Sequence, residues 1–449
     1  MIQIEILVET LHPHPHPELN AVSFVFILPI KIMSITNKNF RIFKHHDLLS
    51  CFENIRQQTI NILKAFRDQL GPNLRVPYTK EINLPIWEFC HVAWFSERWI
   101  CRNPRLSFST KHDQDVDWES HYTGCSILDG ADDFFDSSEI SHKRRWEIDL
   151  PSYSETQNYL LKTKDLIISS LLYNKPISNE DCYFFRLILA HEMMHLEAFK
   201  MTANTLGLRT KDFGLEIPQK PVTGLKNQLV FGKNELDDSL SEKRFQFDNE
   251  ISGENRNVLP FSIDRELVSL EEYLEFTKSK DFFCLDLWSE KGKKWLKNEY
   301  EKKSFYNNLN TKTLNDKALK NKFRFLTTKN IPSLYRNPAL FISFYEAEAF
   351  STWKDRRLPM EAEWTTASEN SDFDWGYCWE WTSDTFTGFD NFISHPYTDY
   401  SKPWFDGNHK TLKGSSFATS SFFKCNYFRN FYLPTRTDLF SGFRTACSV

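Results

Sequence analysis

Two histidines four residues apart are the first groups in this sequence that could do chemistry. His191 and His195 lie in the run AHEMMHLEAF, inside a long segment whose apolar residues recur at helical spacing. On a helix, this spacing places both imidazoles on one face, one turn apart, where they can bind the same metal ion. With 13 histidines in 449 residues, such a pair also arises by chance, so the neighbouring residues must decide between a metal site and two ordinary core histidines.

Those neighbouring residues favour a metal. The helix face that carries the pair is otherwise apolar but also bears Glu197, and buried polar groups of this kind need a partner. A third histidine, His91, lies in another aromatic-rich helical segment, EFCHVAWFSERW. Because a helical bundle can turn His91 towards the other two, we expect His91, His191 and His195 to share one ion.

The same run also fits a hydrolase motif. HEMMH has the HExxH pattern of zinc proteases, in which Glu192 would be the general base. The extended form of that motif fails, since Ala198 stands where glycine is needed and Met201 where the third histidine is needed. Glu216 remains a candidate for a downstream ligand. A zinc hydrolase with an HExxH motif is therefore one function that this run allows.

Helical periodicity predicts the elements that position these histidines. We expect helices over residues 37–70, 85–101 and 156–172, and a fourth that is capped by Asn179 or Asp181 and ends before Gly207. Pro85 suits the first turn of the second helix, where its missing N–H has no partner to lose. Four helices with short connections predict a bundle, and bundle cores are frequent metal sites.

The second half of the chain predicts a different architecture. The helical periodicity fades over residues 208–224, and later segments such as WEWTSDTF, HKTLKGSSFAT and SGFRTACSV suggest strands and loops. Residues 343–353 and 361–367 are helical exceptions, and the charged run 291–320 suggests a solvated surface insertion. The fold class expected for the whole chain is α+β.

Composition limits the partners and the compartment. The net charge is -5 and there is no block of Lys or Arg, which argues against nucleic-acid binding. Nine single cysteines without a CxxC motif are typical of reduced thiols in a cytoplasmic protein. The apolar stretch 21–33 contains Pro29 and is too short to span a membrane. We expect residues 1–36 to be a disordered or mis-assigned extension, with Met33 as the start of translation.

A family resemblance rests on several blocks in order along both halves. HEMMHLEAF and LPIWEFCHVAWFSERW resemble the iron-binding helical domain of EgtB-type ergothioneine sulfoxide synthases. NPALFISFYEAEAFSTWKDRRLPMEAEWTTA, YCWEWTSDTF, HKTLKGSSFAT and YFRNFYLPTRTDLFSGFRTA resemble the second domain of that family. The resemblance implies a DinB-like four-helix bundle over 37–207, a linker over 208–227 and a formylglycine-generating-enzyme-like (C-type-lectin-like) domain over 228–449. Within the superfamily, FFDSSEISHKRRWEIDLPS looks most similar to the SenA-type selenoneine synthases.

The resemblance also implies an activity. These are non-heme Fe(II) enzymes that use O2 to form a C–S or C–Se bond at the imidazole C2 of hercynine, with a thiol or a selenosugar as donor. Three histidines, carried over as His91, His191 and His195, would hold the iron, and Tyr397 would handle a proton or electron near it. Asn430 matches a substrate contact and Arg436 matches an arginine that binds the donor carboxylate. The substrate-binding residues implied are Asn430, Arg436, Tyr400, Tyr432, Met194 and Phe431.

Two departures from the family pattern concern the substrates. Met194 stands where many EgtB-type enzymes have glutamine against hercynine, and Tyr432 stands where some have aspartate against the amine of gamma-glutamylcysteine. Loss of that carboxylate removes a charge-assisted contact of about 1.5–3 kcal/mol. Cysteine or a selenosugar therefore remains open as the donor, as does a non-catalytic ligand-binding role for the whole protein.

Overall fold

The computed structural model describes residues 39–118, 120–223, 227–236, 244–252, 255–303 and 335–449. The predicted N-terminal extension lies outside this range, and so do residues 304–320 of the predicted surface insertion. In the described range, no helix combines the length and the apolar character needed to cross a membrane. The combination of helices and small sheets confirms the α+β class predicted from the sequence.

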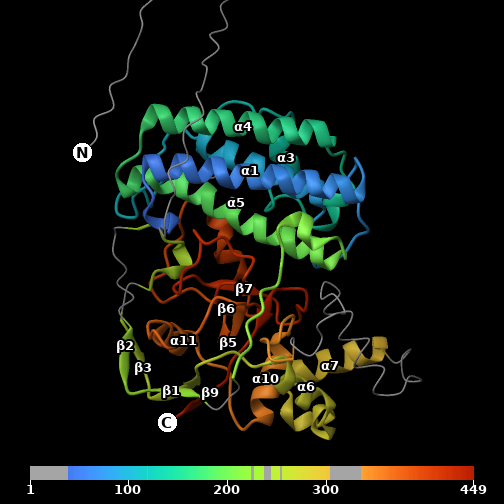
Figure 1. The fold of residues 1–449 in the computed structure, drawn as a ribbon. Helices are drawn as coiled ribbons and strands as arrows, with labels where there is room; N and C mark the ends of the chain where they lie inside the picture. The colour runs from blue at the N-terminus through green and yellow to red at the C-terminus, as the bar shows by residue number, and fades with distance from the viewer. Residues whose placement is uncertain (1–38, 119, 224–226, 237–243, 253–254, 304–334) are drawn as a thin grey trace, which may run out of the picture. The chain divides into compact units, whose positions relative to one another are not determined.

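Four helices form the N-terminal part of the described chain (Figure 1). They are α1 (His45–Leu70), α2 (Pro85–Ser96), α4 (Tyr153–Asn174) and α5 (Asn179–Thr205). α1 and α2 each pack against both α4 and α5, so that two layers of helices enclose a common apolar core. α2 continues into a π-helical segment, Glu97–Cys101, and the short α3 (Ala131–Phe135) packs against it.

Local sequence explains where these helices begin and end. Pro85 occupies the first turn of α2, as predicted. The prediction that Asn179 or Asp181 caps α5 was wrong: the hydroxyl of Ser178 accepts from the Asp181 N–H, which places both predicted residues in the first turn. After α5 the chain leaves the helix at Gly207, whose φ is +70°.

The described residues of the C-terminal part form three small sheets. The largest has the strand order β7-β6-β5-β8, with β8 parallel to β5 and the other pairs antiparallel. Its strands are β5 (Trp379–Thr385), β6 (Lys410–Gly414), β7 (Asn430–Tyr432) and β8 (Ser441–Gly442). The other sheets are β1-β4-β9 (Gln228–Phe231, Phe261–Asp264, Ala446–Ser448) and β2-β3 (Asn234–Leu236, Arg256–Val258).

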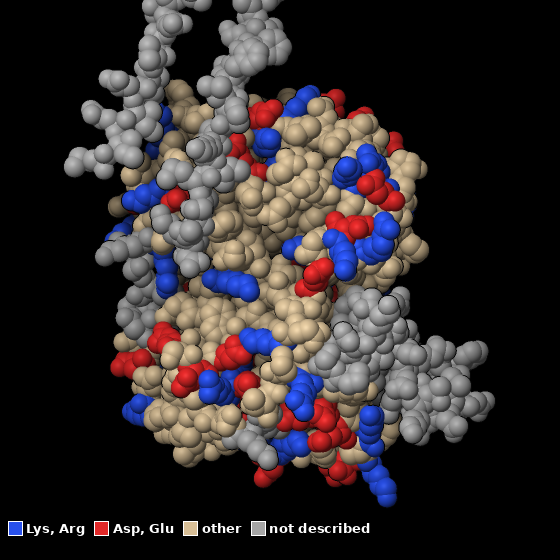
Figure 2. Space-filling model, viewed as in Figure 1, with Lys and Arg blue, Asp and Glu red and all other residues tan. Residues whose placement is uncertain are grey.

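Helices flank these sheets. They are α6 (Leu270–Lys278), α7 (Glu290–Lys303), α10 (Phe344–Trp353) and α11 (Glu361–Ser368). α10 and α11 confirm the two helices predicted in this half. Figure 2 shows Lys and Arg interspersed with Asp and Glu over the described residues of one face, without a stripe of one sign.

Buried polar side chains join the bundle to the sheets. The Glu197 carboxylate of α5 accepts from Trp379 Nε1 (2.8 Å), Ser416 Oγ (2.5 Å) and Thr419 Oγ1 (2.5 Å). Residues two apart on a helix point to different faces, so Glu197 holds the C-terminal part against another face of α5 than the one that carries His191 and His195.

Candidate metal centre

The structure brings the three predicted histidines together. His91 from α2 and His191 and His195 from α5 offer ligand atoms that all lie within 4.8 Å of one another. His91 and His191 are 3% and 4% exposed. The side chain of His195 is 17% exposed and is the most accessible of the three, so a ligand from solvent would approach from its side.

The spacing of the nitrogen atoms fits a metal ion. The Nε2 atoms of His91 and His191 are 3.1 Å apart. Two nitrogens that each lie about 2.1 Å from one ion, at roughly 90–110° to each other, are separated by about 3.0–3.4 Å. The pair therefore already has the separation that shared coordination requires.

Hydrogen bonds behind the rings fix which nitrogen faces the centre. His91 Nδ1 lies 2.7 Å from the Phe135 carbonyl oxygen, which can only accept, so Nδ1 carries the hydrogen and Nε2 of the neutral ring carries the lone pair. His195 Nδ1 lies 2.6 Å from Glu88 Oε1, which fixes the same tautomer. His191 stacks on Phe95, with ring centroids 3.7 Å apart and planes 7° apart. Outer partners of this kind are the usual support of metal-binding histidines.

Burial keeps the inner two histidines neutral. It lowers the pKa of His91 and of His191 well below the ordinary value, and the neighbouring His195 lowers both further. A neutral imidazole offers its lone pair to a metal, whereas a protonated one cannot. The donor set is therefore three nitrogen atoms with a common target, which fits Fe(II) or another borderline divalent ion.

The structure does not support the hydrolase alternative. Both oxygens of Glu192 are engaged in the bundle core: Arg56 donates to them through Nε (2.8 Å) and Nη2 (2.9 Å), and Thr59 Oγ1 donates at 2.7 Å. Glu216 is exposed and lies 3.7 Å from the amine of Lys211. Neither carboxylate belongs to the histidine cluster, so the general base and the downstream ligand of the HExxH reading are both missing.

Tyr397 lies beside the metal centre. Its ring centroid is 4.9 Å from that of Phe95, the residue on which His191 stacks, and 6.4 Å from that of His191 itself. Tyr397 is half-buried and comes from the loop before the short helix Thr398–Tyr400. The C-terminal part thus contributes a phenol close to residues that the bundle supplies.

Three further predicted residues are linked to Tyr397 by a chain of contacts. The ring of Tyr400 is 5.8 Å from that of Tyr397, and its hydroxyl donates to the Met194 sulfur at 3.6 Å. The ring of Phe431 in β7 lies edge-on to Tyr400 at 6.0 Å. Met194, Tyr400 and Phe431 are therefore gathered on the histidine side of α5.

The remaining predicted residues lie further along β7 and in the turn after it. Asn430 pairs with Leu412 across the sheet, and its Oδ1 accepts from the Phe431 N–H. Arg436 lies 5.2 Å over the Tyr432 ring and donates through Nε and Nη2 to both oxygens of Asp438, each at 2.6 Å. A donor carboxylate at Arg436 would therefore compete with Asp438.

Sequence reasoning missed Glu88 and Arg145. Glu88 holds His195, as described above, and it is a lone acid in the apolar run PIWEFCHVAWF, a signal that could have identified it. The Arg145 guanidinium lies 3.9 Å over the Trp87 ring, and Trp87 in turn stacks 5.1 Å from His91. Burial lowers the pKa of Arg145 to about 10, while Glu88 and Tyr397 counteract this. No ion pair joins Arg145 to a carboxylate of the described residues.

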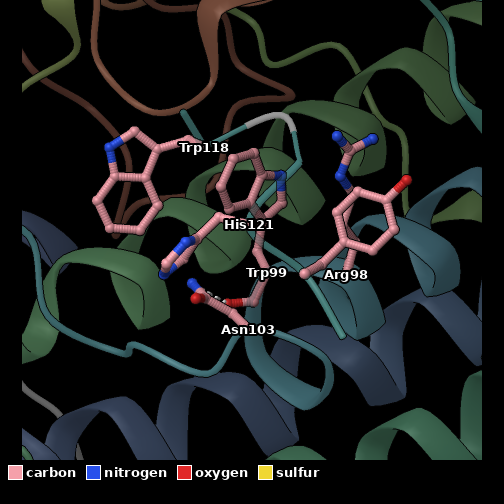
Figure 3. A pocket seen from close by; sticks show the side chains of 6 residues that line it. Arg98, Trp99, Asn103, Trp118 and His121 are labelled. Atoms are coloured by element: carbon pink, nitrogen blue, oxygen red, sulfur yellow. Dashed lines mark hydrogen bonds between the residues drawn. The ribbon is translucent and has the colours of Figure 1, made fainter. Parts of the chain in front are cut away.

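Two small cavities lie beside Arg98 and Trp99. One is lined by Arg98, Trp99, Asn103, Trp118, His121 and Tyr122 (Figure 3). The other reaches Tyr397 and is lined by Trp94, Phe95, Arg98, Trp99, Asp136, Ser137 and Asp399 as well. Each has a volume of about 10 Å³, which is enough for about one water. A larger substrate must therefore bind elsewhere, and the exposed edge of His195 is the accessible side of the centre.

Comparison with known proteins shows which proteins this chain is similar to. Residues 228–377 match the family model for the sulfatase-modifying factor enzyme 1-like domain. A hercynine oxygenase from Mycolicibacterium smegmatis is 24% identical over 88% of this chain and 97% of its own length. Hercynine oxygenases from Mycobacterium tuberculosis and Mycolicibacterium thermoresistibile are 21% and 22% identical, over 81% and 84% of this chain and 91% and 90% of their own lengths. The similarity therefore runs through both the bundle and the sheets.

Proposed function

Because this chain belongs to the EgtB-type family, we propose that it is a non-heme Fe(II) enzyme that uses O2 to join sulfur or selenium to the imidazole C2 of hercynine. The observation that carries the proposal is the convergence of the His91, His191 and His195 ligand atoms within 4.8 Å. The proposal includes a DinB-like identity for the bundle over residues 37–207, a linker over 208–227 and a formylglycine-generating-enzyme-like domain over 228–449. The free cysteines of the described chain favour a cytoplasmic location.

Three imidazoles suit the chemistry. When bound, Fe(II) would activate O2 and accept the soft chalcogen of the donor at the positions that the three nitrogens leave open. His91 and His191 are deeply buried and stay neutral, so their lone pairs remain available. The partial exposure of His195 leaves one side of the centre open to substrates.

The aromatic residues supply the remaining functions. Tyr397 is the candidate acid because its phenol belongs to the ring that packs beside Phe95 and His191. Phe431 and Tyr400 present faces that can attract the trimethylammonium group of hercynine by cation–π interaction. Arg145 offers a buried positive charge near His91 that would attract a substrate carboxylate.

The donor is proposed to differ from gamma-glutamylcysteine. Tyr432 offers no carboxylate to a donor amine, and the charge of Arg436 is already balanced by Asp438. Both features reduce the gain from binding a donor with several charges. A selenosugar or free cysteine fits this part of the site better.

The test is turnover by the full chain after anaerobic reconstitution with Fe(II). Oxygen consumption would be followed with hercynine plus cysteine, gamma-glutamylcysteine or selenoglucose in turn, and the product would be identified by mass spectrometry. We expect hercynine-dependent consumption with one donor and a product that carries the chalcogen on the imidazole ring.

Two controls make the result specific. Omission of hercynine should abolish product formation, and His112→Ala, which alters an exposed histidine, should turn over like the wild type. Absence of product with all three donors, from protein that has bound one Fe(II), would overturn the proposed reaction.

A further inference from the structure

We propose that Glu88 is a positioning residue that orients His195 for metal binding and thereby sets the metal affinity of the centre. This inference deepens the proposed function, because it concerns the same three-histidine site. It assigns a role to a side chain that is neither a ligand nor a substrate contact.

The geometry is specific. Glu88 Oε1 lies 2.6 Å from His195 Nδ1, and Glu88 is 1% exposed. Glu88 precedes His91 by three residues on α2, so both side chains project from one face of the same helix. One helix therefore supplies a ligand and also holds a second ligand that belongs to α5.

The chemistry of the contact fixes the ring. An ionised carboxylate can only accept, so the hydrogen of the neutral His195 ring is held on Nδ1 and the lone pair on Nε2 faces the centre. The short bond to an anion also increases the electron density that the imidazole offers to a cation. Without Glu88, His195 could rotate or adopt the other tautomer, and either change would remove one ligand from the site.

The three histidines are supported in different ways. His91 donates to the backbone carbonyl of Phe135, and His191 stacks on the apolar face of Phe95. His195 is also the most exposed of the three and so the least restricted by packing. The hydrogen bond to Glu88 therefore restrains the His195 ring, which packing restrains least.

A buried acid can also be purely structural, and the chain offers a matched example. Glu97 is likewise 1% exposed and continues the same helical stretch, but its carboxylate accepts from Tyr159 and from the Ile127 N–H. Replacement of Glu97 perturbs a buried carboxylate without touching a ligand. Comparison of Glu88→Gln with Glu97→Gln thus separates positioning from general stability.

The experiment measures equilibrium Fe(II) binding to the metal-free full chain under anaerobic conditions, by competition with a chromophoric chelator. We expect Glu88→Gln to weaken binding about 10- to 100-fold, and Glu97→Gln to bind like the wild type. In a double-mutant cycle, Glu88→Gln should have no further effect in a His195→Gln background, because Glu88 acts through His195. Equal affinity of folded Glu88→Gln and wild type would overturn the inference.

A second measurement does not depend on whether the variant folds. Nitrogen-15 NMR of the metal-free wild type, labelled at histidine, should show His195 as the Nδ1–H tautomer. An Nε2–H tautomer would overturn the inference. Tight Fe(II) binding with no effect of Glu88→Gln would reject the role of Glu88 alone, whereas absence of Fe(II) binding by the wild type would reject the role of Glu88 and the proposed function together.

Discussion

The two sides of the centre are built by different means. On the bundle side, the three candidate ligands project from α2 and α5; hydrogen bonds hold His91 and His195 from behind, and His191 stacks on Phe95. On the sheet side, Tyr397 and Tyr400 come from a loop and Phe431 from a three-residue strand, and ring contacts relate them to the histidines. Regular helices therefore position the three histidines, whereas less regular segments position the aromatic residues beside them.

The largest expected effect is on the bundle side. His191→Ala removes the ligand that stacks on Phe95 and faces His91 Nε2 at 3.1 Å. Fe(II) binding should fall by more than about 100-fold and hercynine turnover should be lost, as measured by metal competition and mass spectrometry. Tight Fe(II) binding by His191→Ala would contradict this account, because the two helices would then not supply the metal ligands.

Tyr397→Phe should reduce product formation without weakening Fe(II) binding, and so separate the role of the sheet side from that of the bundle side. General acid–base groups contribute about 10²–10⁴-fold to a rate, so we expect a loss of product formation of that order. Fe(II) affinity should stay within a factor of a few of the wild type, because Tyr397 belongs to the loop and not to the ligand set. An equal loss of metal affinity would mean that loop and helices are not independent.

Stability should depend strongly on the buried pair behind the histidines. Arg56→Ala leaves the Glu192 carboxylate buried without its ion partner, and breaking such a pair costs about 3–5 kcal/mol. Chemical denaturation monitored by circular dichroism would measure the free energy of unfolding. Arg67→Ala, which removes an exposed partner of Asp68 on the same helix, should change it little, and equal losses in both variants would contradict the explanation.

The smallest effect concerns pH and the loop side. Burial lowers the pKa of His395 to about 4, below the 6.5 of an unfolded histidine. Between pH 4 and pH 6.5, His395 binds a proton in the unfolded chain but not in the folded chain. The contribution of His395 to the free energy of unfolding is therefore complete above pH 6.5 and is lost as the pH falls towards 4. The shift corresponds to at most about 3 kcal/mol. His395→Gln should therefore show a flatter decline in unfolding free energy between pH 7 and 5, and an unchanged decline would contradict the assignment.

The sequence predicted the bundle side of the centre better than the sheet side. The four helices and the pairing of His191 with His195 follow from periodicity, which is a local property. The position of His91 required a bundle, and Glu192 could be placed only when Arg56, far away in sequence, was seen to bind it. The capping role of Ser178 at the start of α5 was missed because neighbouring polar residues cap helices about equally well.

The sheet side was accessible only through family resemblance. Tyr397, Tyr400 and Phe431 carry no periodic signal, since a loop, a short helical turn and a three-residue strand bring them together. Arg436 was predicted to bind a donor carboxylate, but no sequence rule revealed that Asp438 would occupy its guanidinium. Contacts between residues that are distant in sequence, or inside turns, lie beyond what local patterns report.

The most direct test of the central claim is a crystal structure of the Fe(II)-loaded chain with anomalous data at the iron edge. We predict one iron peak within coordination distance of His91, His191 and His195, on the side of the Nε2 atoms. An iron peak elsewhere, or a peak that lacks any one of these three histidines as a ligand, would contradict the account.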